Sequence, residues 1–346
     1  MPRSRSLTVK TVKEQLLARL QSGRMHPGAR FPSTRAIARV HGISCQSAQT
    51  VCAELEREGW IARRRGSGSY VRAKPPPLRG VELIFAAHAR RAESVGGNLL
   101  QLLLNGLRGT GLEVRVRFAT GDRLEVGEST YVAVWECRSL AMRLARGGRL
   151  VLLLNDRPAP GEAACRIDSV EVDHFRGGQA AARWLRALRA DAEVAIFSGP
   201  RQDRRNRERI AGFRSLEPTA RIVNGGSWFY DRALRAASRV AGEEAVFCCG
   251  DCLAAAVIDA AARSGRTPPL VVGFDGSLTA RRMGFATIAV PWLECATAAV
   301  QLIVRRLRGE RFPAERITLP PRLWSGKCSE IGSILPGEER AASSLR

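Results

Sequence analysis

One stretch of the chain, residues 45–58, carries side chains whose types and spacing could read the bases of a DNA duplex. Apolar residues recur at helical spacing along one side of it, at Ala48, Val51, Cys52 and Leu55. The opposite side carries amide, hydroxyl and methyl groups, at Gln46, Gln49, Thr50 and Ala53. Glutamine can bond an adenine edge in a major groove, and a small apolar group can contact a thymine methyl. This face predicts base contacts, with an ordinary solvated helix face as the alternative.

The residues before this stretch predict a shorter helix and a tight turn. Ser33 can cap the short helix, and Gly42 can end it in a left-handed conformation. Ser44 can then cap the helix at 45–58. The apolar side expected for the short helix comprises Ala36, Ile37 and Val40. The two helices have the spacing of a helix-turn-helix unit.

A basic hairpin is predicted directly after the helix pair. A strand begins near Trp60, and the run RRRGSG at 63–68 forms a basic turn before Tyr70. Such a turn suits a wing that lies on phosphates or in a minor groove. Residues 1–74 hold 15 basic and 4 acidic side chains, which is half of the net charge of +22 in a fifth of the chain. This concentration is typical of a module that neutralises phosphates.

Residues 8–73 resemble a GntR-type winged helix-turn-helix domain. The resemblance rests on the connector GRMHPGARFP at 23–32, the Pro-Ser-x-Arg opening of the short helix, and the segment EGW…RRRGSGSYV. Cys45 and Gln49 stand where the family usually has arginine, so an unusual operator is expected. Together, the face and the resemblance imply DNA contacts from Arg35, Ser44, Cys45, Gln46, Ser47, Gln49, Thr50, Arg64, Arg65, Gly66, Ser67 and Gly68.

From residue 81 onward, short apolar runs alternate with helical patterns, which predicts an α/β fold with parallel sheets. The expected strands are 81–86, 114–118, 131–135, 150–154, 193–197, 221–223, 245–248 and 270–274. The expected helices are 98–107, 139–146, 175–189, 206–215, 231–241, 253–264 and 296–307. Because a single sheet usually has fewer strands than this, we expect two Rossmann-like lobes, each with its own sheet. Ligands bind beyond the carboxyl ends of strands in such folds, here 85–88, 155–158, 198–209, 250–251 and 275–277.

Residues 81–328 resemble the effector domains of LacI/GalR-type regulators, which are related to periplasmic sugar-binding proteins. The motifs that carry the resemblance are VDHFRGGQAAA at 172–182, GP…RIAGFR at 199–214, AVFCCGD at 245–251 and VVGFD at 271–275. The resemblance implies chain crossovers between lobes near Asp173, Val290 and Leu319, and a homodimer. It also implies effector contacts from Arg209 and Asp275. The full set of expected effector-binding residues is Arg205, Arg209, Trp228, Asp251 and Asp275.

Two features bear on the kind of effector. Gly250 stands where many family members have asparagine, which removes a two-sided hydrogen-bonding group. Arginines crowd one strand-to-helix region at positions 201, 204, 205, 207 and 209, which suggests a phosphorylated or carboxylated sugar. Trp228 could stack on a sugar ring, and packing between the lobes is the alternative.

The sequence therefore predicts a winged helix-turn-helix DNA-binding domain at 1–73, a proline-rich linker at 74–80, an effector-binding and dimerisation domain at 81–328 and a polar tail at 329–346. The expected function is transcriptional regulation, with repression as the favoured mode, through a palindromic operator in double-stranded DNA. The small-molecule effector is expected to be a sugar or sugar derivative. A DNA-binding factor without ligand control is the alternative.

Enzyme classes are disfavoured by missing residues. GntR-type heads also occur on aminotransferase-like domains that bind pyridoxal phosphate through a lysine, but after residue 81 the only lysine is Lys327. The four histidines are scattered, and we find no Gly-x-Gly-x-x-Gly after the first strand of the expected body, no Gly-x-Ser-x-Gly elbow and no Walker loop. We therefore expect no catalytic residue, cofactor or metal.

Cysteine use and hydropathy bear on the compartment. No apolar run approaches the length of a membrane span, and the first ten residues lack the apolar core of a signal peptide, so a cytoplasmic protein is expected. Its nine cysteines should stay reduced. Cys249 and Cys252 form a CxxC without a second pair, which favours buried small residues over a zinc or redox site.

Overall fold

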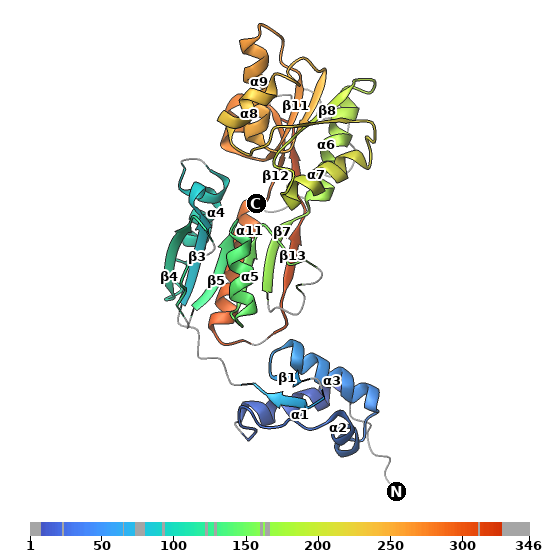
Figure 1. Cartoon of the computed structure of the whole chain (residues 1–346), viewed down its shortest axis with the longest axis vertical. Coiled ribbons are helices and arrows are strands. Elements are labelled where there is room, and N and C mark those ends of the chain that lie inside the picture. The colour runs from blue at the N-terminus through green and yellow to red at the C-terminus, as the bar shows by residue number, and fades with distance from the viewer. Residues whose placement is uncertain are drawn as a thin grey trace, which may run out of the picture.

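Three parts make up the computed structural model: a small head and two lobes (Figure 1). Residues 73–79 and 327–346 lie outside the described residues, and with them most of the expected linker, the whole expected tail and Lys327. Gly80, expected at the end of the linker, is instead the first residue of a strand. The structure describes residues 8–22, 24–64, 66–72, 80–91, 94–121, 124–127, 130–159, 162, 167–310 and 312–326.

The head is a three-helix unit with a two-stranded hairpin. Its elements are α1 (Val9–Gln21), α2 (Thr34–His41), α3 (Cys45–Arg57), β1 (Ile61–Arg64) and β2 (Gly68–Val71). The three caps predicted for α2 and α3 are confirmed: Ser33 and Ser44 each accept a bond from a backbone N–H, and Gly42 has a φ of 63°. A shared core holds the elements together and includes Val12, Leu16, Ile37, Leu55 and Ile61, all 1% exposed or less.

One residue of the head was assigned to the wrong side. Val40, expected on the apolar side of α2, is 70% exposed, whereas Ile37 and Ala38 are buried. At 100° per residue, Val40 lies about 110° from the direction midway between Ile37 and Ala38, so it points away from the core. The eight-residue helix has only four apolar residues, three of them consecutive, which was too few to fix its buried side.

Each lobe is built on a six-stranded sheet. In the N-terminal lobe the strand order is β13-β7-β6-β5-β3-β4, and all neighbours are parallel. Its elements are β3 (Gly80–Ala86), η1 (Ala87–Arg90), α4 (Val95–Leu107), β4 (Glu113–Ala119), β5 (Thr130–Trp135), α5 (Arg138–Arg146), β6 (Val151–Leu154), β7 (Ile167–Val172), α11 (Trp292–Leu307) and β13 (Arg316–Leu319).

The C-terminal lobe has the strand order β14-β12-β11-β10-β8-β9, with β14 antiparallel to β12. Its elements are α6 (His174–Leu188), β8 (Val194–Ser198), α7 (Arg204–Arg214), β9 (Arg221–Asn224), α8 (Tyr230–Ala237), β10 (Ala245–Cys248), α9 (Asp251–Arg263), β11 (Leu270–Asp275), α10 (Leu278–Met283), β12 (Ala286–Ala289) and β14 (Arg322–Trp324).

The chain crosses between the lobes three times, as predicted. It passes from β7 to α6 at Asp173, from β12 to α11 at 290–291, and from β13 to β14 at 320–321. The first and third segments are adjacent where they leave the N-terminal lobe, since the Asp173 N–H donates to the Leu319 carbonyl at 2.9 Å. The amphipathic helix expected at 296–307 is the main part of α11, and it buries its apolar side against α4 and the sheet of the N-terminal lobe.

A buried ion pair ties α11 to the N-terminal sheet. Arg306, which is 4% exposed, donates from Nε to Asp168 Oδ2 at 2.9 Å and from Nη2 to Asp168 Oδ1 at 2.8 Å. Tyr131 donates its hydroxyl to the same carboxylate at 2.5 Å. Arg306 also donates to the carbonyls of Phe312 and Pro313. The charges are thus buried with their hydrogen bonds satisfied, which is the condition under which such a pair is tolerated.

Among the described residues, no helix combines the length and apolar character that a membrane crossing needs.

Candidate functional site

Four of the five residues predicted to bind an effector lie together where strands of the C-terminal lobe end. Arg209 Nη2 lies 3.2 Å from Asp275 Oδ1. The guanidinium groups of Arg209 and Arg205 lie 5.5 and 6.0 Å from the centre of the Trp228 ring. Two acids that we did not select join them, so the group that we call the interlobe cluster comprises Glu136, Asp203, Arg205, Arg209, Trp228 and Asp275.

Arg209 is the most enclosed member of the cluster, at 3% exposure. Besides its bond to Asp275, it donates from Nη1 to the carbonyl of Cys249 at 2.6 Å and from Nε to His174 Nδ1 at 3.3 Å. Its guanidinium lies 3.7 Å from the centre of the Phe274 ring. Burial and the nearby Arg209 charge lower the pKa of His174 well below its ordinary value, so this histidine is neutral. Arg209 is therefore held in one orientation.

Arg205 joins the two lobes. It donates from Nη2 to Asp203 Oδ2 at 2.7 Å within the C-terminal lobe, and it forms an ion pair with Glu136 of the N-terminal lobe. Trp228 Nε1 donates to the same Asp203 oxygen at 3.0 Å. On the other side, Glu136 Oε2 lies 2.7 Å from His88 Nε2. The side chains that follow β3 and β5 are thereby connected to those that follow β8 and β9.

The carboxylates around Arg205 stay charged. Burial alone would raise the pKa of Asp203, but the Arg205 charge and the hydrogen bonds from Arg205 and Trp228 hold it well below its ordinary range. Burial likewise opposes ionisation of Glu136, and Arg205 and His88 outweigh it and lower the pKa of Glu136.

This pairing argues against the anionic sugar suggested by the crowd of arginines. Arg205 is paired with two carboxylates, Arg209 with Asp275, and Arg204 with three acids outside the cluster. Within the cluster three carboxylates face two arginines, and Asp275 is more exposed than Arg209, at 20% against 4% of the side chain. A phosphate or carboxylate would have to displace one of these acids and would then be repelled by the others. The hydroxyl groups of a neutral sugar could donate to the carboxylates and accept from the guanidinium groups.

Backbone strain marks the same strand ends. The described residues contain three non-glycine residues with positive φ: Glu136 at 54°, Asn155 at 54° and Asp275 at 119°. Glu136 and Asn155 directly follow β5 and β6, and Asp275 is the last residue of β11. Such conformations cost of order 1–3 kcal/mol each and concentrate at functional sites.

Three buried polar atoms near these strand ends lack a hydrogen-bond partner in the described part of the chain. They are Trp135 Nε1, Asn155 Oδ1 and His174 Nε2. Buried polar groups are normally satisfied, by protein, water or a ligand. Trp135 and Asn155 lie at strand ends of the N-terminal lobe, and His174 is the first residue of α6 in the C-terminal lobe, so both lobes contribute.

Three residues near the site were not predicted from the sequence, although each follows the carboxyl end of a strand, where ligands bind in such folds. Asn155 and Asp203 fall within the segments where a ligand site was expected, at 155–158 and 198–209, but they were not among the five predicted residues. Asp203 does cap α7 and also binds Arg205. Glu136 was missed altogether, although it directly follows the strand expected at 131–135. Applying the strand-end rule to that strand would have found it.

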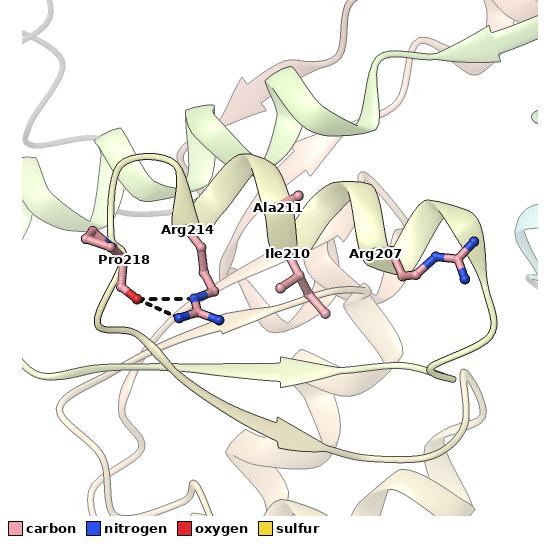
Figure 2. Close-up of a pocket in the computed structure, with 5 residues that line it drawn as sticks. All are labelled: Arg207, Ile210, Ala211, Arg214 and Pro218. Carbon is pink, nitrogen blue, oxygen red and sulfur yellow. Dashed lines mark hydrogen bonds between the residues drawn. The ribbon is translucent and has the colours of Figure 1, made fainter.

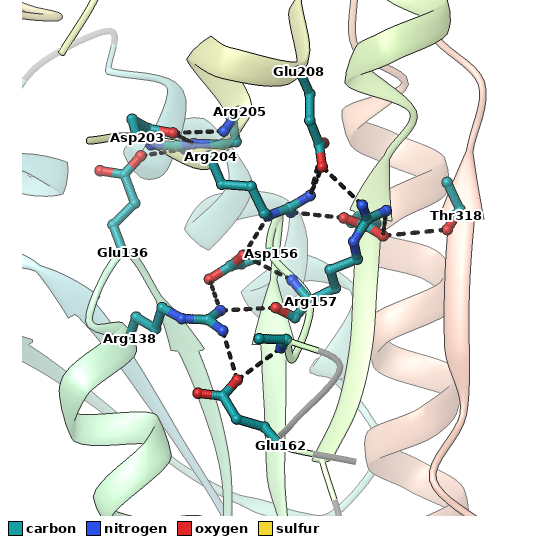
Figure 3. A network of polar contacts seen from close by, with 12 residues as sticks. Glu136, Arg138, Asp156, Arg157, Glu162, Asp203, Arg204, Arg205, Glu208 and Thr318 are labelled. Carbon is teal, nitrogen blue, oxygen red and sulfur yellow. Dashed lines mark hydrogen bonds and ion pairs between the residues drawn. The ribbon is translucent and has the colours of Figure 1, made fainter. Parts of the chain in front are cut away.

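A second group of charges, which we call the cross-lobe network, lies beside the interlobe cluster (Figure 3). Arg204 of α7 bonds to Glu171 at 2.7 Å and to Asp156 at 3.2 Å, both in the N-terminal lobe. Arg157 of the N-terminal lobe bonds in return to Glu208 of α7 at 2.8 Å. The network comprises Arg138, Asp156, Arg157, Glu162, Glu171, Arg204 and Glu208. The start of α7 is thus fixed to the N-terminal lobe by charges of both signs.

Asp251, the fifth predicted effector residue, is not exposed to the space beside the cluster. Its side chain is 1% exposed and accepts bonds from the Ser277 N–H at 2.7 Å and the Thr287 hydroxyl at 2.6 Å. Burial and the nearby Asp275 charge raise the pKa of Asp251 to about 7, and the two hydrogen bonds only partly oppose this.

The raised pKa of Asp251 predicts a pH-dependent stability. Its folded-state pKa of about 7 lies above the ordinary value of 3.8, so between these values the folded protein keeps a proton that the unfolded chain has lost. The contribution of this group to the free energy of unfolding is therefore largest at acid pH and falls as pH rises towards 7. Urea unfolding at about pH 5 and about pH 8 should show it, and Asp251→Asn should reduce the difference. An equal pH dependence in both proteins would contradict the prediction.

In the head, the predicted DNA-reading residues on α2, on α3 and in the turn between them are accessible. Arg35, Ser44, Cys45, Gln46, Gln49 and Thr50 are all exposed, and Ser47 is half-buried. Ser44 caps the helix through a bond from the Ser47 N–H at 3.0 Å, and Thr50 donates to the Gln46 carbonyl at 3.1 Å. The amide groups of Gln46 and Gln49 remain available for base edges.

The acids at the end of α3 are neutralised within the head. Lys13 pairs with Glu54 at 2.9 Å and with Glu58 at 2.5 Å. Glu56 pairs with Arg63 at 3.2 Å. These pairs keep negative charge away from a phosphate backbone that approaches the N-terminal end of α3.

The hairpin tip has the conformation of a tight, exposed turn. Gly66 and Gly68 have φ values of 75° and 107°, which suit glycine. Ser67 Oγ lies 2.6 Å from the Tyr70 hydroxyl, and the Arg64 guanidinium lies 4.8 Å from the centre of the Tyr70 ring. Arg65 lies outside the described residues.

A hollow of about 440 Å³ lies on α7 (Figure 2). It is lined by Arg207, Ile210, Ala211, Arg214 and Pro218, and Arg214 donates to the Pro218 carbonyl at 2.8 Å. It contains none of the predicted effector residues.

The cysteines of the CxxC motif do not have thiolate character. Cys249 is buried, as expected, but Cys252 is exposed, so the expectation of two buried residues was wrong for it. Burial raises the pKa of the Cys249 thiol to about 12, and desolvation with the nearby Asp275 and Asp251 charges raises that of Cys252 to about 11. The described residues contain no group of three or more His, Cys, Asp or Glu side chains that could hold a metal ion. Cys45 is exposed, with a free thiol, among the residues predicted to contact DNA.

Comparison with known proteins gives a separate match for each part of the chain. Residues 8–71 match the model of bacterial regulatory proteins of the gntR family, and residues 150–311 match that of the periplasmic binding protein domain. The HTH-type transcriptional repressor PurR of Klebsiella pneumoniae is 28% identical over 179 residues, which are 47% of this chain and 52% of PurR. The chain thus spans about half the length of the curated relatives it matches.

Solved structures share the fold. The transcriptional regulator CelR in complex with cellobiose aligns with a TM-score of 0.60 at 17% identity, covering 86% of this chain and 99% of CelR. A LacI family regulator from Enterococcus faecium with bound ribose aligns with a TM-score of 0.55 at 17% identity, covering 71% of this chain and 97% of the regulator. The chain joins a helix-turn-helix domain of the gntR family to a two-lobed periplasmic-binding-protein-like domain with the fold of LacI family regulators.

Proposed function

We propose that the protein is a sequence-specific DNA-binding transcriptional regulator that is controlled by a small molecule bound between its two lobes. The observation that carries the proposal is the interlobe cluster, in which Arg209, Asp275 and Trp228 of one lobe are connected through Arg205 to Glu136 of the other. A molecule that binds there would contact both lobes and so change their relative position.

We propose a neutral sugar or sugar derivative as the effector. The cluster offers carboxylates and guanidinium groups that can bond to hydroxyls, and an indole that can stack on a sugar ring. The CelR complex with cellobiose and the ribose complex of the Enterococcus regulator support the class of ligand. The balance of charge in the cluster disfavours the phosphorylated or carboxylated sugar considered from the sequence.

We further propose a homodimer that acts as a repressor in the cytoplasm, without catalytic activity. Two heads would read the halves of a palindrome spaced by about one helical turn or a multiple of it. The two-fold arrangement would let lobe closure change the spacing of the heads. The proposal of a homodimeric repressor is supported by the combination of a helix-turn-helix head and a two-lobed body in one chain.

Selection of random duplex DNA by the purified protein tests the proposal. At near-physiological salt, sequencing of the bound pool should give a palindrome with a fixed centre. Addition of a panel of neutral mono- and disaccharides, including ribose and cellobiose, should then change the affinity for the selected site. Charge-driven binding without an enriched sequence would overturn sequence-specific regulation.

The alternative of a DNA-binding factor without ligand control has its own outcome. It predicts the palindrome but no sugar that shifts the melting temperature or the DNA affinity. That result would leave the head as assigned and would reject the effector role of the interlobe cluster.

The recognition helix gives a sharper prediction. Gln49→Arg should move the preference at one position of each half-site towards guanine, with discrimination of about 1–3 kcal/mol, because arginine bonds bidentately to guanine. Binding to the selected pool, sequenced for both proteins, measures the change. Arg64→Ala is the matched control, since loss of a phosphate contact should weaken all sequences alike. A uniform gain for Gln49→Arg would show that this residue faces phosphate.

A further inference from the structure

We infer that Asp251 and Thr287 are positioning residues for the effector site: they fix the turn that presents Asp275, and neither contacts the ligand. The inference rests on the proposed function, because it concerns the site between the lobes. It reassigns Asp251, which the sequence placed among the effector contacts. Asp251 is 1% exposed and Thr287 is fully buried, so neither can reach a molecule between the lobes.

The turn at residues 275–277 has an unusual backbone. Asp275 has a φ of 119° and Gly276 a φ of 71°. The first value is costly for a residue with a side chain, so surrounding contacts must hold it. This backbone conformation directs the Asp275 carboxylate towards Arg209 at the end of β11, with Oδ1 3.2 Å from Arg209 Nη2.

Side chains from three other elements hold this turn through its backbone groups. The Asp275 carbonyl accepts from Trp292 Nε1 at 3.0 Å. The Gly276 N–H donates to Thr287 Oγ1 at 3.2 Å, and the Ser277 N–H donates to Asp251 Oδ2 at 2.7 Å. The Thr287 hydroxyl in turn donates to Asp251 Oδ1 at 2.6 Å, so the two side chains act as one unit.

The sequence around the turn is shaped to admit Asp251. A Cβ on Gly273 would lie 2.2 Å from Asp251 Oδ1, so only glycine fits beneath the carboxylate. A Cβ on Gly276 would lie 2.8 Å from Ala289 Cβ, in addition to the strain of its positive φ. Gly273 is therefore explained by the space that the Asp251 side chain occupies, and Gly276 by its positive φ and by the closeness of Ala289.

Thr287→Val tests the inference in the full-length protein, because it keeps the shape of threonine and removes the hydroxyl. Thr287→Ser, which keeps the hydroxyl, is the matched control. The first readout needs no ligand: hydrogen exchange of the segment 272–280 should become faster in the valine variant, through the amides of Gly276 and Ser277, and stay near wild type in the serine variant. The second readout is calorimetric titration with ribose and cellobiose, where the valine variant should lose at least tenfold in affinity and the serine variant should recover most of it.

Unchanged exchange at 272–280 in Thr287→Val would overturn the inference, as would normal affinity for a sugar that the wild type binds. Failure of the wild type to bind any sugar would reject the proposed effector class, while the exchange experiment would still decide the role of Thr287. If the valine variant does not fold, Thr287→Ala gives the same comparison without the extra methyl group. Loss of protection spread over the whole lobe, in either variant, would indicate a general structural role and would also count against the inference.

Discussion

Replacement of Arg209 by methionine is expected to lower the affinity for the effector at least 100-fold. The change removes the donor to Asp275 and leaves this partly buried carboxylate beside Asp251 without its cation. A hydrogen bond to a charged group contributes about 1.5–3 kcal/mol, and an unpaired buried charge costs more. About 2.7 kcal/mol already corresponds to a factor of 100. Calorimetric titration with the sugar that shifts the wild type measures the loss.

Arg207→Met is the control for this change. Arg207 lies two residues away on the same helix and is exposed. It should leave the affinity for the sugar unchanged. Both variants should still bind the selected DNA in the absence of sugar, because the head is untouched. Normal sugar affinity in Arg209→Met would show that the ligand binds elsewhere.

Replacement of Arg306 by alanine is expected to reduce the free energy of unfolding by about 3–5 kcal/mol. The guanidinium holds the carboxylate of Asp168, which is fully buried, and two carbonyls of the segment that follows α11. Its removal leaves Asp168 charged in the core with Tyr131 and the Glu315 N–H as remaining donors. The urea concentration at which the N-terminal lobe loses protection from hydrogen exchange measures the effect.

The neighbouring Arg305 provides the comparison. Its side chain is 39% exposed and pairs with Glu310 and Glu315 on the surface. Exposed ion pairs contribute about 0–1 kcal/mol, so Arg305→Ala should have a small effect. A similar decrease in the free energy of unfolding for Arg306→Ala and Arg305→Ala would mean that the buried ion pair stabilises the fold no more than a surface pair does.

Local signals in the sequence were sufficient for most of the fold. All eight predicted strands are present. Six of them are largely buried apolar runs, whereas β4 and β9 lie at the edges of their sheets and expose several residues. The strands that were not assigned are β7, β12, β13 and β14. In β7 the polar Asp168 and Glu171 interrupt the apolar run, and they are buried because Arg306, Arg157 and Arg204 reach them from distant segments. The other three strands are only three or four residues long.

The site was predicted less completely, for a related reason. Arg209 and Asp275 could be found because they lie in sequence motifs of the family that the chain resembles. The role of Asp251 could not, because its partner Thr287 lies 36 positions along the chain. The expectation of an anionic effector was based on the arginines alone. Their acidic partners, Glu136 and Asp156 among them, come from the other lobe, and their proximity depends on the crossovers of the chain.

The cross-lobe network has a consequence for how DNA binding by this protein should be measured. For a rigid protein, the slope of log affinity against log salt concentration counts the phosphates that it neutralises. Here added salt would also weaken the pairs of Arg204 and Arg157 with acids of the opposite lobe, which are partly exposed. The measured slope would then combine loss of phosphate contacts with a change in lobe position. A phosphate count requires the isolated head domain, and the difference between its slope and that of the full chain reports the salt sensitivity of the body.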